Sequence, residues 1–472
     1  MGEADRRTIQ SGVAGVELME AAGWAVANAI RSRFSPRRVV VLAGPGNNGG
    51  DGFVVARLLD RAGWPVRLAL LGARQALKGD AAIMAERWHG PIESLSLSAL
   101  DGADLVVDAL FGAGLSRPLE GKARAIVEAI NRQGLACVAV DVPSGLEGDS
   151  GRILGVAPQV VLTVTFFRAK PGHHLRPGRD CCGEVVVADI GIGEDVLATI
   201  RPRCFANHPD LWSLPVPGPD SHKYKRGHAL IIGGAAMTGA ARLAARAARR
   251  VGAGMVTLAS PASAVALYTG GQPGMIVHPM DSDAALFALI KLRKISAAVI
   301  GPGLGIASKN KKRILSLLGL KLPLVLDADA LTLFENDPKS LFAAIMGPVL
   351  LTPHEGEFRR LFPWSGDRLA AVRQAAKRSG AVVLLKGSDT VIAAPDGLAL
   401  INEAPADLAT AGSGDVLAGL ACGLLAQGLD PLAAAGAASW LHAEAGRQAG
   451  AGLIAEDLVE YLPAILAKRR GA

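Results

Sequence analysis

Short apolar segments alternate with helical segments along most of the chain, and the apolar segments are nearly continuous. In the first half they are VVVLAG (39–44), VRLALLG (66–72), ADLVVDAL (103–110) and ACVAVDV (136–142), with a helix predicted over 53–62. Strands that are apolar on both sides are typical of a parallel sheet that helices cover on both faces. The pattern therefore predicts an α/β fold.

The alternation starts again in the second half, after a proline-rich stretch without periodicity at 202–222. Its apolar segments are HALIIGG (228–234), AAVIGPG (297–303), LPLVLDAD (322–329), PVLLTPHEGEF (348–358) and AVVLLKG (381–387). Residues 415–427 are apolar all round, which predicts a buried helix. The 472 residues exceed the usual ~150-residue domain about threefold. We predict two tandem α/β domains, 1–207 and 222–472, with a linker at 208–221.

The charge of the chain favours a small anionic ligand over a nucleic acid. There are 50 Lys and Arg against 43 Asp and Glu, which gives a net charge of +7, and the basic residues are scattered. A nucleic-acid groove would need a clustered basic surface. A solvated surface without a partner fits the charge alone equally well.

Neither a disulfide framework nor a membrane segment is predicted. The five cysteines show no CxxC spacing, so ordinary thiols in a reducing cytoplasm are expected. Residues 251–280 carry no charge, but prolines and glycines interrupt them, which predicts a buried strand, turn and strand. The chain opens without an apolar leader, and we expect a cytoplasmic protein.

A glycine-rich loop, GPGNNGGDG (44–52), follows the first strand and opens a helix. Gly44, Gly46 and Gly49 satisfy G-x-G-x-x-G, but the second strand does not end in the acidic residue of a dinucleotide site. Glycine amides at a helix N-terminus cradle phosphate, and Asn47, Asn48 and Asp51 add oxygen ligands. The loop therefore predicts a phosphate site with further polar contacts.

Two more strands of the first half end in a carboxylate, Asp108 and Asp141. A single aspartate at a strand end is more often a helix cap than a ligand. In a parallel sheet both would face the same edge as the glycine-rich loop, where open α/β sheets bind ligands. Converging oxygens of this kind suit a cation. The three segments together predict a pocket for a cation and a phosphate.

The motifs GPGNNGGDG, DALFGAGLSRPLEG, VAVDVPSGL and TVTFFRAKPGHH resemble those of the NAD(P)H-hydrate epimerase family, across residues 3–205. The resemblance implies a Rossmann-like three-layer sandwich that binds potassium (K+) through Asn48, Asp108 and Ser144. It also implies contacts to the hydrated dinucleotide from Asn47, Asn48, Gly49, Gly50, Asp51, Gly112, Ala113, Gly114, Leu115, Ser116, Arg117, Pro118 and Asp141. The sequence departs from the family at MEAAG (19–23), where an Asn usually follows the Glu.

The chemistry of epimer exchange needs one acid and base group. Hydrated NAD(P)H carries a hydroxyl on C6 beside ring nitrogen N1. Removal of the hydroxyl proton lets the C6–N1 bond open to an aldehyde, and reclosure on the other face inverts the centre. We predict that Asp141 is this catalytic group; the alternative is that it only holds a ribose hydroxyl.

The second half contains one weak and one sharper signal. Glycines 233, 234 and 239 after a strand form a generic phosphate or ribose site, and the arginines at 242, 246, 249 and 250 are typical of a solvated or subunit-facing stripe. The loop Ala411–Asp415 precedes the buried helix, and its amides would form an anion hole with Asp415 as an adjacent base. No Walker A motif is present.

The motifs GGAAMTGAA, GPGLG, DADAL, LTPHEGEF, LKGSDT and AGSGDVLAG occur in this order. They resemble the ADP-dependent NAD(P)H-hydrate dehydratase family of the ribokinase-like superfamily, over about residues 222–465. The resemblance implies nucleotide (ADP/AMP) contacts from Lys386, Gly387, Ser388, Asp389, Thr390 and Gly414. It implies contacts to the hydrated dinucleotide from Ala241, Gly303, His354 and Asp415.

Asp415 is the predicted catalytic base of the dehydratase. It would take the proton of the C6 hydroxyl as this oxygen attacks the terminal phosphate of ADP, with the anion hole and a magnesium ion (Mg2+) stabilising the transferred group. His354 would take the C5 proton or, as the favoured alternative, only hold the substrate.

Three functions remain open from the sequence. The first is a bifunctional repair enzyme whose substrates are the small molecules NADHX, NADPHX and ADP, and which forms a homo-oligomer, because related dehydratases are tetrameric. The second is a ribokinase-like small-molecule kinase with a regulatory N-terminal domain. The third is a chain whose first half is a ligand sensor without turnover. Nucleic-acid and membrane partners are not expected.

Overall fold

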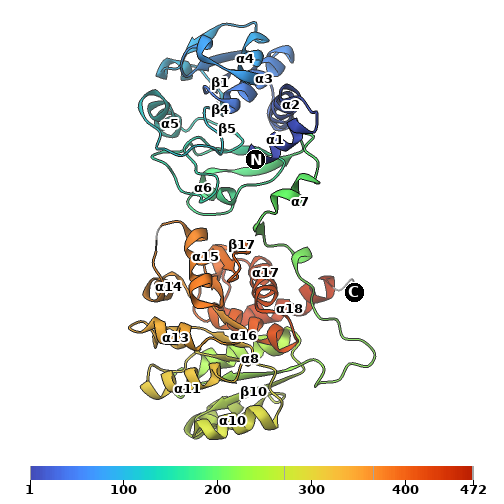
Figure 1. The fold of residues 1–472 in the computed structure, drawn as a ribbon, viewed down its shortest axis with the longest axis vertical. Helices are drawn as coiled ribbons and strands as arrows, with labels where there is room; N and C mark the ends of the chain where they lie inside the picture. Colours follow the sequence, from blue (N-terminus) through green and yellow to red (C-terminus); the bar gives the residue numbers. More distant parts are fainter. Residues whose placement is uncertain (1, 271, 365, 470–472) are drawn as a thin grey trace. The chain divides into compact units, whose positions relative to one another are not determined.

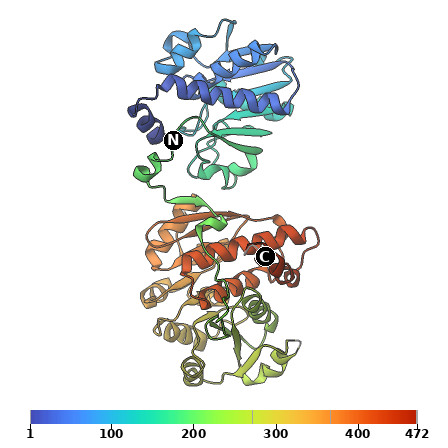
Figure 2. The ribbon, with the colours of Figure 1, turned by 90° about the vertical axis from the view of Figure 1, so that its right-hand side faces the viewer.

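The computed structural model describes residues 2–270, 272–364 and 366–469, and it divides into two compact units between Pro202 and Arg203. Each unit is an α/β structure with its own sheet (Figures 1 and 2). The predicted tandem α/β organisation is therefore confirmed. Among the described residues, no helix combines the length and the apolar character that crossing a membrane requires.

The first unit is built on a seven-stranded sheet in which every neighbouring pair is parallel, in the order β3-β2-β1-β4-β5-β6-β7. Its strands are β1 Val39–Ala43, β2 Val66–Leu70, β3 Ile92–Ser94, β4 Leu105–Ala109, β5 Cys137–Val140, β6 Leu162–Phe166 and β7 Glu184–Ala188. Its helices are α1 Gly2–Gln10, α2 Gly15–Arg33, α3 Asn47–Arg61, α4 Gly79–Glu86, α5 Gly121–Gln133, α6 Gly178–Cys181 and α7 Val196–Ile200.

Alternate residues of the first sheet face two separate cores. Val39 and Val41 pack with α2 and α3 on one face, whereas Val40 and Leu42 pack with α5 on the other. Figure 1 shows α2 and α5 on opposite sides of β1 and β4. The chain winds outward in both directions from the neighbouring strands β1 and β4, so the strand order reverses there. Ligands bind in doubly wound sheets at this switch point.

The second unit is built on a ten-stranded sheet, in the order β11-β10-β9-β12-β13-β14-β15-β16-β17-β8. Its strands are β8 Cys204–Ala206, β9 His228–Ile232, β10 Met255–Ser260, β11 Ile276–Pro279, β12 Ala297–Ile300, β13 Leu324–Leu326, β14 Val349–Leu351, β15 Val382–Leu385, β16 Asp389–Ala393 and β17 Ala399–Glu403. The pairing is parallel from β11 to β15, and β16 is antiparallel to both of its neighbours.

Helices α8, α16, α17 and α18 contribute the main apolar core of the second unit, and α16 packs against α8 in its centre. The prediction that 415–427 forms a buried helix is confirmed, since nearly all of α16 is buried. The helices of this unit are α8 Thr238–Arg250, α9 Val265–Thr269, α10 Asp283–Leu292, α11 Ser308–Leu318, α12 Asp329–Thr332, α13 Pro338–Ala344, α14 Glu355–Leu361, α15 Arg368–Ser379, α16 Ser413–Ala426, α17 Pro431–Ala449 and α18 Ala455–Arg469.

The boundary between the units differs from the sequence prediction. Residues 203–207 were placed in the first domain, but β8 within them is the edge strand of the second sheet and runs parallel to β17. Part of the predicted linker 208–221 also belongs to this unit, because the buried Trp212 packs edge-on against Trp440 of α17. A short strand and one anchoring tryptophan lack the repeated apolar pattern by which sequence reasoning finds elements.

Two local predictions also need correction. The helix predicted to start at residue 53 begins at Asn47, so most of the glycine-rich loop forms the first turns of α3. The stretch 251–280 was expected to contain a strand, a turn and a strand, but the short helix α9 lies between β10 and β11.

The predicted arginine stripe makes contacts within the second unit. Arg246 and Arg250 both pair with Glu460 of α18.

Candidate active sites

A cavity of about 580 Å³ lies at the switch point of the first sheet. Helix α1 and the start of α2 line it together with the segments that follow β1 and β4. Most of the residues predicted to contact the substrate line this cavity: Asn47, Asn48, Asp51, Gly112, Ala113, Gly114, Leu115, Ser116, Arg117 and Asp141. Gly49, Gly50 and Pro118 are not among the lining residues.

The glycines of the first loop allow close approaches of the backbone. A Cβ atom on Gly44 would overlap the carbonyl oxygen of Leu110, so the ends of β1 and β4 touch only because residue 44 is glycine. A Cβ on Gly49 would overlap the carbonyl of Gly44, and one on Gly50 would collide with the Met19 side chain. Gly49 and Gly50 therefore bring α3 close to the strand and to α2, which positions the lining residues.

Asp141 follows β5 and is held by a dense set of polar contacts. Its Oδ1 accepts hydrogen bonds from Lys170 Nζ (2.5 Å) and from Thr165 Oγ1 (3.0 Å), and its Oδ2 accepts one from the backbone nitrogen of Ala113 (3.1 Å). Burial alone would raise the pKa of Asp141, but the charge and hydrogen bond of Lys170, with those of Ala113 and Thr165, hold it below its ordinary value. The cavity therefore contains an ionised carboxylate.

Three further carboxyl groups line the same cavity, those of Asp5, Asp51 and Asp80. Burial raises the pKa of Asp51 well above its ordinary value, and the nearby charges of Asp141 and Asp5 raise it further. Burial also raises the pKa of Asp5 on α1. Within this cavity the pKa of Asp141 is lowered while the pKa values of Asp51 and Asp5 are raised, and such opposite tuning is expected where protons are transferred.

The three residues predicted to bind potassium lie beside this cavity. Asp108 is fully buried; its carboxylate accepts hydrogen bonds from the Ser144 hydroxyl (2.6 Å) and the Ser144 backbone nitrogen (2.7 Å). Burial raises the pKa of Asp108, and no cationic side chain of the described residues pairs with it. The Asn48 side-chain nitrogen is buried without a hydrogen-bond partner among these residues. A carboxylate without a cation, beside hydroxyl and amide oxygens, fits a hard monovalent ion.

The second site begins at the corresponding edge of the second sheet. The loops that follow β9 and β12 touch, because a Cβ on Gly234 would overlap the carbonyl of Gly303. Gly303 has φ +62° and packs against the backbone of Met237. Ala241 is fully buried in α8 beneath Gly233. The structure therefore brings Gly303 and Ala241 to the two sides of one switch point.

Lys386, which follows β15, is the cationic centre of this site. Its ammonium lies 2.7 Å from Asp327 Oδ1 and 3.9 Å from Glu357 Oε2, and a Cβ on Gly414 would lie 3.4 Å from it. Burial opposes its charged form, but Asp327 and Glu357 outweigh this effect and raise its pKa. Lys386 therefore lies, fully charged, at the N-terminus of α16.

Asp415 lies in the first turn of α16, beside the predicted anion hole. Burial raises its pKa to about 6; Asp327, Asp329 and Glu357 add to this effect, while Lys386 opposes it. Gly412, at the N-cap, has φ +87°, a conformation that only glycine adopts easily. A base of this strength is still mostly ionised at neutral pH but holds a proton better than an ordinary aspartate.

His354 caps a helix. Its Nδ1 accepts hydrogen bonds from the backbone nitrogens of Gly356 (2.9 Å) and Glu357 (3.3 Å), while Glu357 Oε2 accepts one from the His354 backbone (2.8 Å). This is a capping box at the start of α14. Because Nδ1 is engaged, only Nε2 could face a substrate, and it lies 3.4 Å from Glu357.

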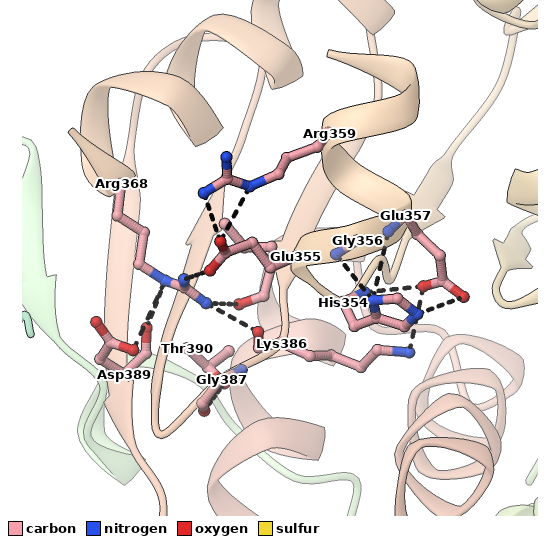
Figure 3. A network of polar contacts seen from close by, with 11 residues as sticks. His354, Glu355, Gly356, Glu357, Arg359, Arg368, Lys386, Gly387, Asp389 and Thr390 are labelled. Carbon is pink, nitrogen blue, oxygen red and sulfur yellow. Dashed lines mark hydrogen bonds and ion pairs between the residues drawn. The ribbon is translucent and has the colours of Figure 1, made fainter. Parts of the chain in front are cut away.

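Arg368 binds the backbone of the predicted nucleotide loop (Figure 3). Its guanidinium is almost buried and donates to the carbonyl oxygens of Lys386 (2.8 Å) and Asp389 (3.0 Å). The loop is closed by Thr390, whose hydroxyl donates to the carbonyl of Gly387 (2.8 Å) and accepts from its nitrogen (3.2 Å). Lys386, Gly387, Asp389 and Thr390 are therefore held in one rigid turn.

Sequence reasoning missed four residues of these sites. Lys170, Asp327 and Glu357 lie in the motifs TVTFFRAKPGHH, DADAL and LTPHEGEF, so their positions were noticed but no role was assigned to them. Arg368 lies at the start of α15, outside all of these motifs, and nothing in the sequence marks it.

A Rossmann-like unit with an acidic cavity, followed by a ribokinase-like unit with a lysine and an aspartate at the N-terminus of a buried helix, defines a two-domain α/β enzyme. The family described as YjeF-related protein N-terminus matches residues 15–172, and the NAD(P)H-hydrate dehydratase family matches residues 229–467. The chain belongs to the bifunctional NAD(P)H-hydrate repair enzyme family.

Relatives of this family match the chain along almost its whole length. The bifunctional NAD(P)H-hydrate repair enzyme Nnr of Salinibacter ruber is 38% identical and covers 100% of this chain and 96% of its own. The enzyme of the same name from Moorella thermoacetica is 38% identical, with 99% and 95% covered. A ribokinase-like superfamily protein from Enterococcus faecalis, solved by crystallography, has a TM-score of 0.52 and 25% identity, and covers 56% of this chain and 96% of its own.

Proposed function

We propose that the chain repairs hydrated NAD(P)H in two steps: the first unit interconverts the R and S epimers, and the second dehydrates the S epimer at the expense of ADP, giving AMP and phosphate. The observation that carries the proposal is the pair of differently tuned aspartates. Asp141 faces a cavity at the first switch point, and Asp415 lies in the first turn of α16 in the second unit.

In the first unit Asp141 acts as acid and base. Its carboxylate takes the C6 hydroxyl proton, the C6–N1 bond breaks to give an aldehyde, and N1 takes up a proton. After rotation N1 attacks the other face of the aldehyde, loses its proton, and the new hydroxyl regains one. The remaining predicted contacts, from Asn47, Asp51 and the loop Gly112–Pro118, hold the substrate around the reacting carbon.

In the second unit Asp415 takes the hydroxyl proton while this oxygen attacks the terminal phosphorus of ADP, and AMP leaves. The phosphate ester then leaves C6 with the help of the N1 lone pair, and loss of a C5 proton restores NAD(P)H. The amides at the start of α16 and the ammonium of Lys386 bind the transferred phosphate. Lys386, Gly387, Ser388, Asp389, Thr390 and Gly414 hold the nucleotide, while Ala241, Gly303 and His354 hold the hydrated dinucleotide.

The residues present fit the two metal ions. Potassium would be held by Asn48, Asp108 and Ser144, where it would balance the buried carboxylate and order the phosphate loop. Among the described residues no group of three or more Asp, Glu, His or Cys side chains is arranged to hold a metal. Magnesium usually binds through one or two carboxylates together with substrate phosphates, and Asp327 or Glu357 would supply them.

A coupled assay with matched variants tests the proposal. Acid-hydrated NADH and ADP are added, and recovery of the absorbance of reduced nicotinamide is followed. Wild type should recover all of it, Asp141→Asn should stop after the S fraction, and Asp415→Asn should lose dehydration by about 10²-fold or more while epimers still exchange. Loss of both activities in a folded Asp415→Asn protein contradicts independent sites, and a phosphorylated alcohol found by mass supports the kinase alternative.

The ion assignment has its own test. A single carboxylate, Asp108, balances one positive charge better than two, which favours potassium over magnesium. Potassium should stimulate epimer exchange of the wild type more than sodium at equal ionic strength, and Asp108→Ala should weaken substrate binding without changing dehydration of pure S epimer. Equal exchange with and without potassium means that Asn48, Asp108 and Ser144 are structural.

The homo-oligomer, with a tetramer as the expected form, remains a prediction from the resemblance. Light scattering of the purified chain measures it directly.

A further inference from the structure

Asp141 has a backbone conformation that needs support from its surroundings. Its φ is +66°, in the left-handed region that side chains other than glycine rarely adopt. Its backbone nitrogen donates to the carbonyl of Val164 (2.8 Å), and its carbonyl accepts from His173 Nε2 (3.1 Å). Strained residues of this kind persist where neighbouring contacts fix them, and they concentrate at active sites.

Lys170 contacts the carboxylate of Asp141 from the side away from the cavity. Its side chain is 7% exposed, and it is not among the residues that line the cavity. Its ammonium donates to Asp141 Oδ1 (2.5 Å), Thr165 Oγ1 (2.6 Å) and, more weakly, the carbonyl of Phe166 (3.4 Å). All three ammonium hydrogens are thus directed at the protein, so Lys170 acts on a substrate only through Asp141.

His173 completes the support of the backbone. It is 2% exposed, and its Nδ1 accepts a hydrogen bond from the backbone nitrogen of Lys170 (3.0 Å). Nε2 therefore carries the hydrogen and donates to the Asp141 carbonyl. Burial, with the nearby charge of Lys170, lowers its pKa to about 4, so the ring stays neutral.

We propose that Lys170 and His173 are positioning residues of epimer exchange: Lys170 keeps the Asp141 carboxylate ionised with Oδ2 toward the cavity, and His173 fixes its strained backbone. The proposal rests on the proposed epimerase function. The two carboxylate oxygens of Asp141 have different hydrogen-bond partners. Oδ1 is saturated by Lys170 and Thr165, whereas Oδ2 accepts only the Ala113 amide among the described contacts and keeps a lone pair for the proton of the substrate.

The first experiment replaces Lys170 in the full-length protein, with potassium present at a saturating concentration. Lys170→Met should lower kcat of epimer exchange by about 10²-fold or more and change KM by less than about threefold, because Lys170 does not touch the substrate. Lys170→Arg keeps the charge and should retain more activity than Lys170→Met. Lys122→Met, an exposed lysine on α5, is the matched control, and dehydration of pure S epimer by the same samples reports that the chain is intact.

The pH profile separates positioning from a purely structural role. The charged and titratable groups around Asp141 are Lys170 and His173 after β6, Asp51 on α3 and Asp5 on α1, together with Asp80 and Arg117, which line the same cavity. Only Lys170 changes in Lys170→Met, so the acid limb of exchange should move up by about 1 to 3 pH units. A folded Lys170→Met protein with wild-type kcat and an unshifted acid limb overturns the role of Lys170.

A second pair of variants keeps the proposal falsifiable if Lys170→Met does not fold. His173→Gln retains a side-chain donor for the Asp141 carbonyl, whereas His173→Phe removes it. Exchange should survive largely in the Gln variant and fall by about tenfold or more in the Phe variant. Equal activity of the two overturns the role of His173. Absence of exchange in the wild type, by contrast, refutes the proposed function itself.

Discussion

At the scale of single residues, the two aspartates assigned to proton transfer are tuned in opposite directions by their surroundings. Asp141 is buried and Asp415 is half-buried, and removal from water raises the pKa of a carboxyl group. At Asp141 burial is the largest single effect, but Lys170 together with the hydrogen bonds from Ala113 and Thr165 outweighs it, so the pKa is lowered. Beside Asp415 the carboxylates of Asp327, Asp329 and Glu357 add to burial and outweigh Lys386, so its pKa rises to about 6. The same side chain therefore serves as a persistent carboxylate in one unit and as a stronger base in the other.

The pKa of Asp415 predicts the pH dependence of dehydration. Only the ionised carboxylate can take the hydroxyl proton, so the rate on pure S epimer should rise as pH increases through about 6 and level off above it. Initial rates measured between pH 4.5 and 8 check this. If the acid limb of the pH–rate profile lies entirely below pH 5, the assignment of Asp415 as the catalytic base is contradicted.

The stability of Asp415→Asn provides the control for this interpretation. Because the pKa of Asp415 in the fold lies above its unfolded value, the native state loses stability as pH rises between about 4 and 6. Asparagine removes this loss, so the variant should be more stable than wild type at pH 7 but not at pH 4. Denaturant unfolding at the two pH values measures the difference.

At the scale of single elements, α15 supports the nucleotide loop through one side chain. Arg368 donates to the carbonyls of Lys386 and Asp389, and it also lies 3.5 Å from Glu355 (Figure 3). Arg368→Ala should raise KM for ADP by about tenfold, because two charge-assisted hydrogen bonds that hold the loop are lost. Arg359→Ala, which removes an exposed pair with Glu355 and a cation–π contact with Trp364, should leave KM unchanged. Equal values for both variants would mean that the loop is rigid without Arg368.

Elements and residues could be predicted where a short stretch of sequence carries the pattern that marks them. The strands around Val41, Leu230 and Leu350 could be predicted because each is apolar on both faces. Asp108, Asp141 and Asp415 became candidate site residues because they end strands or open a helix. Lys170 reaches Asp141 across 29 residues of sequence, and Arg368 reaches Lys386 across 18. Such contacts depend on how strands are paired and not on spacing along the chain, so the sequence could not show them.

At the scale of the whole molecule, each unit has its own apolar core and its own sheet. The core of the first unit is formed within residues 4–200, and the main core of the second contains residues from Phe205 to Leu466. The division at Pro202 has a physical basis, since the chain that follows immediately enters the second sheet as β8. The segment between the last helix of one unit and the first strand of the next is therefore shorter than the proline content of 202–222 suggested.

The position of β8 predicts how the chain can be cut. A fragment that starts at residue 203 keeps the edge strand, whereas one that starts at 208 exposes β17. The second cut removes the hydrogen bonds from Ala399 to the Arg203 carbonyl (3.0 Å), from Asn207 to the Ile401 carbonyl (2.7 Å) and from the Asn207 side chain to Gly436 (2.8 Å). Residues 203–207 also make hydrogen bonds to Trp212, Arg373, Asp396 and Asn402, so with about 1 kcal/mol for each net hydrogen bond the shorter fragment should be less stable by at least about 3 kcal/mol. Urea unfolding of the two fragments, together with their dehydratase rates, measures this loss of stability.

A fragment ending at 202 should exchange epimers as well as one ending at 207, because residues 203–207 belong to the other unit. If both second-unit fragments unfold at the same urea concentration, β8 contributes nothing to the sheet and the unit effectively starts later in the chain.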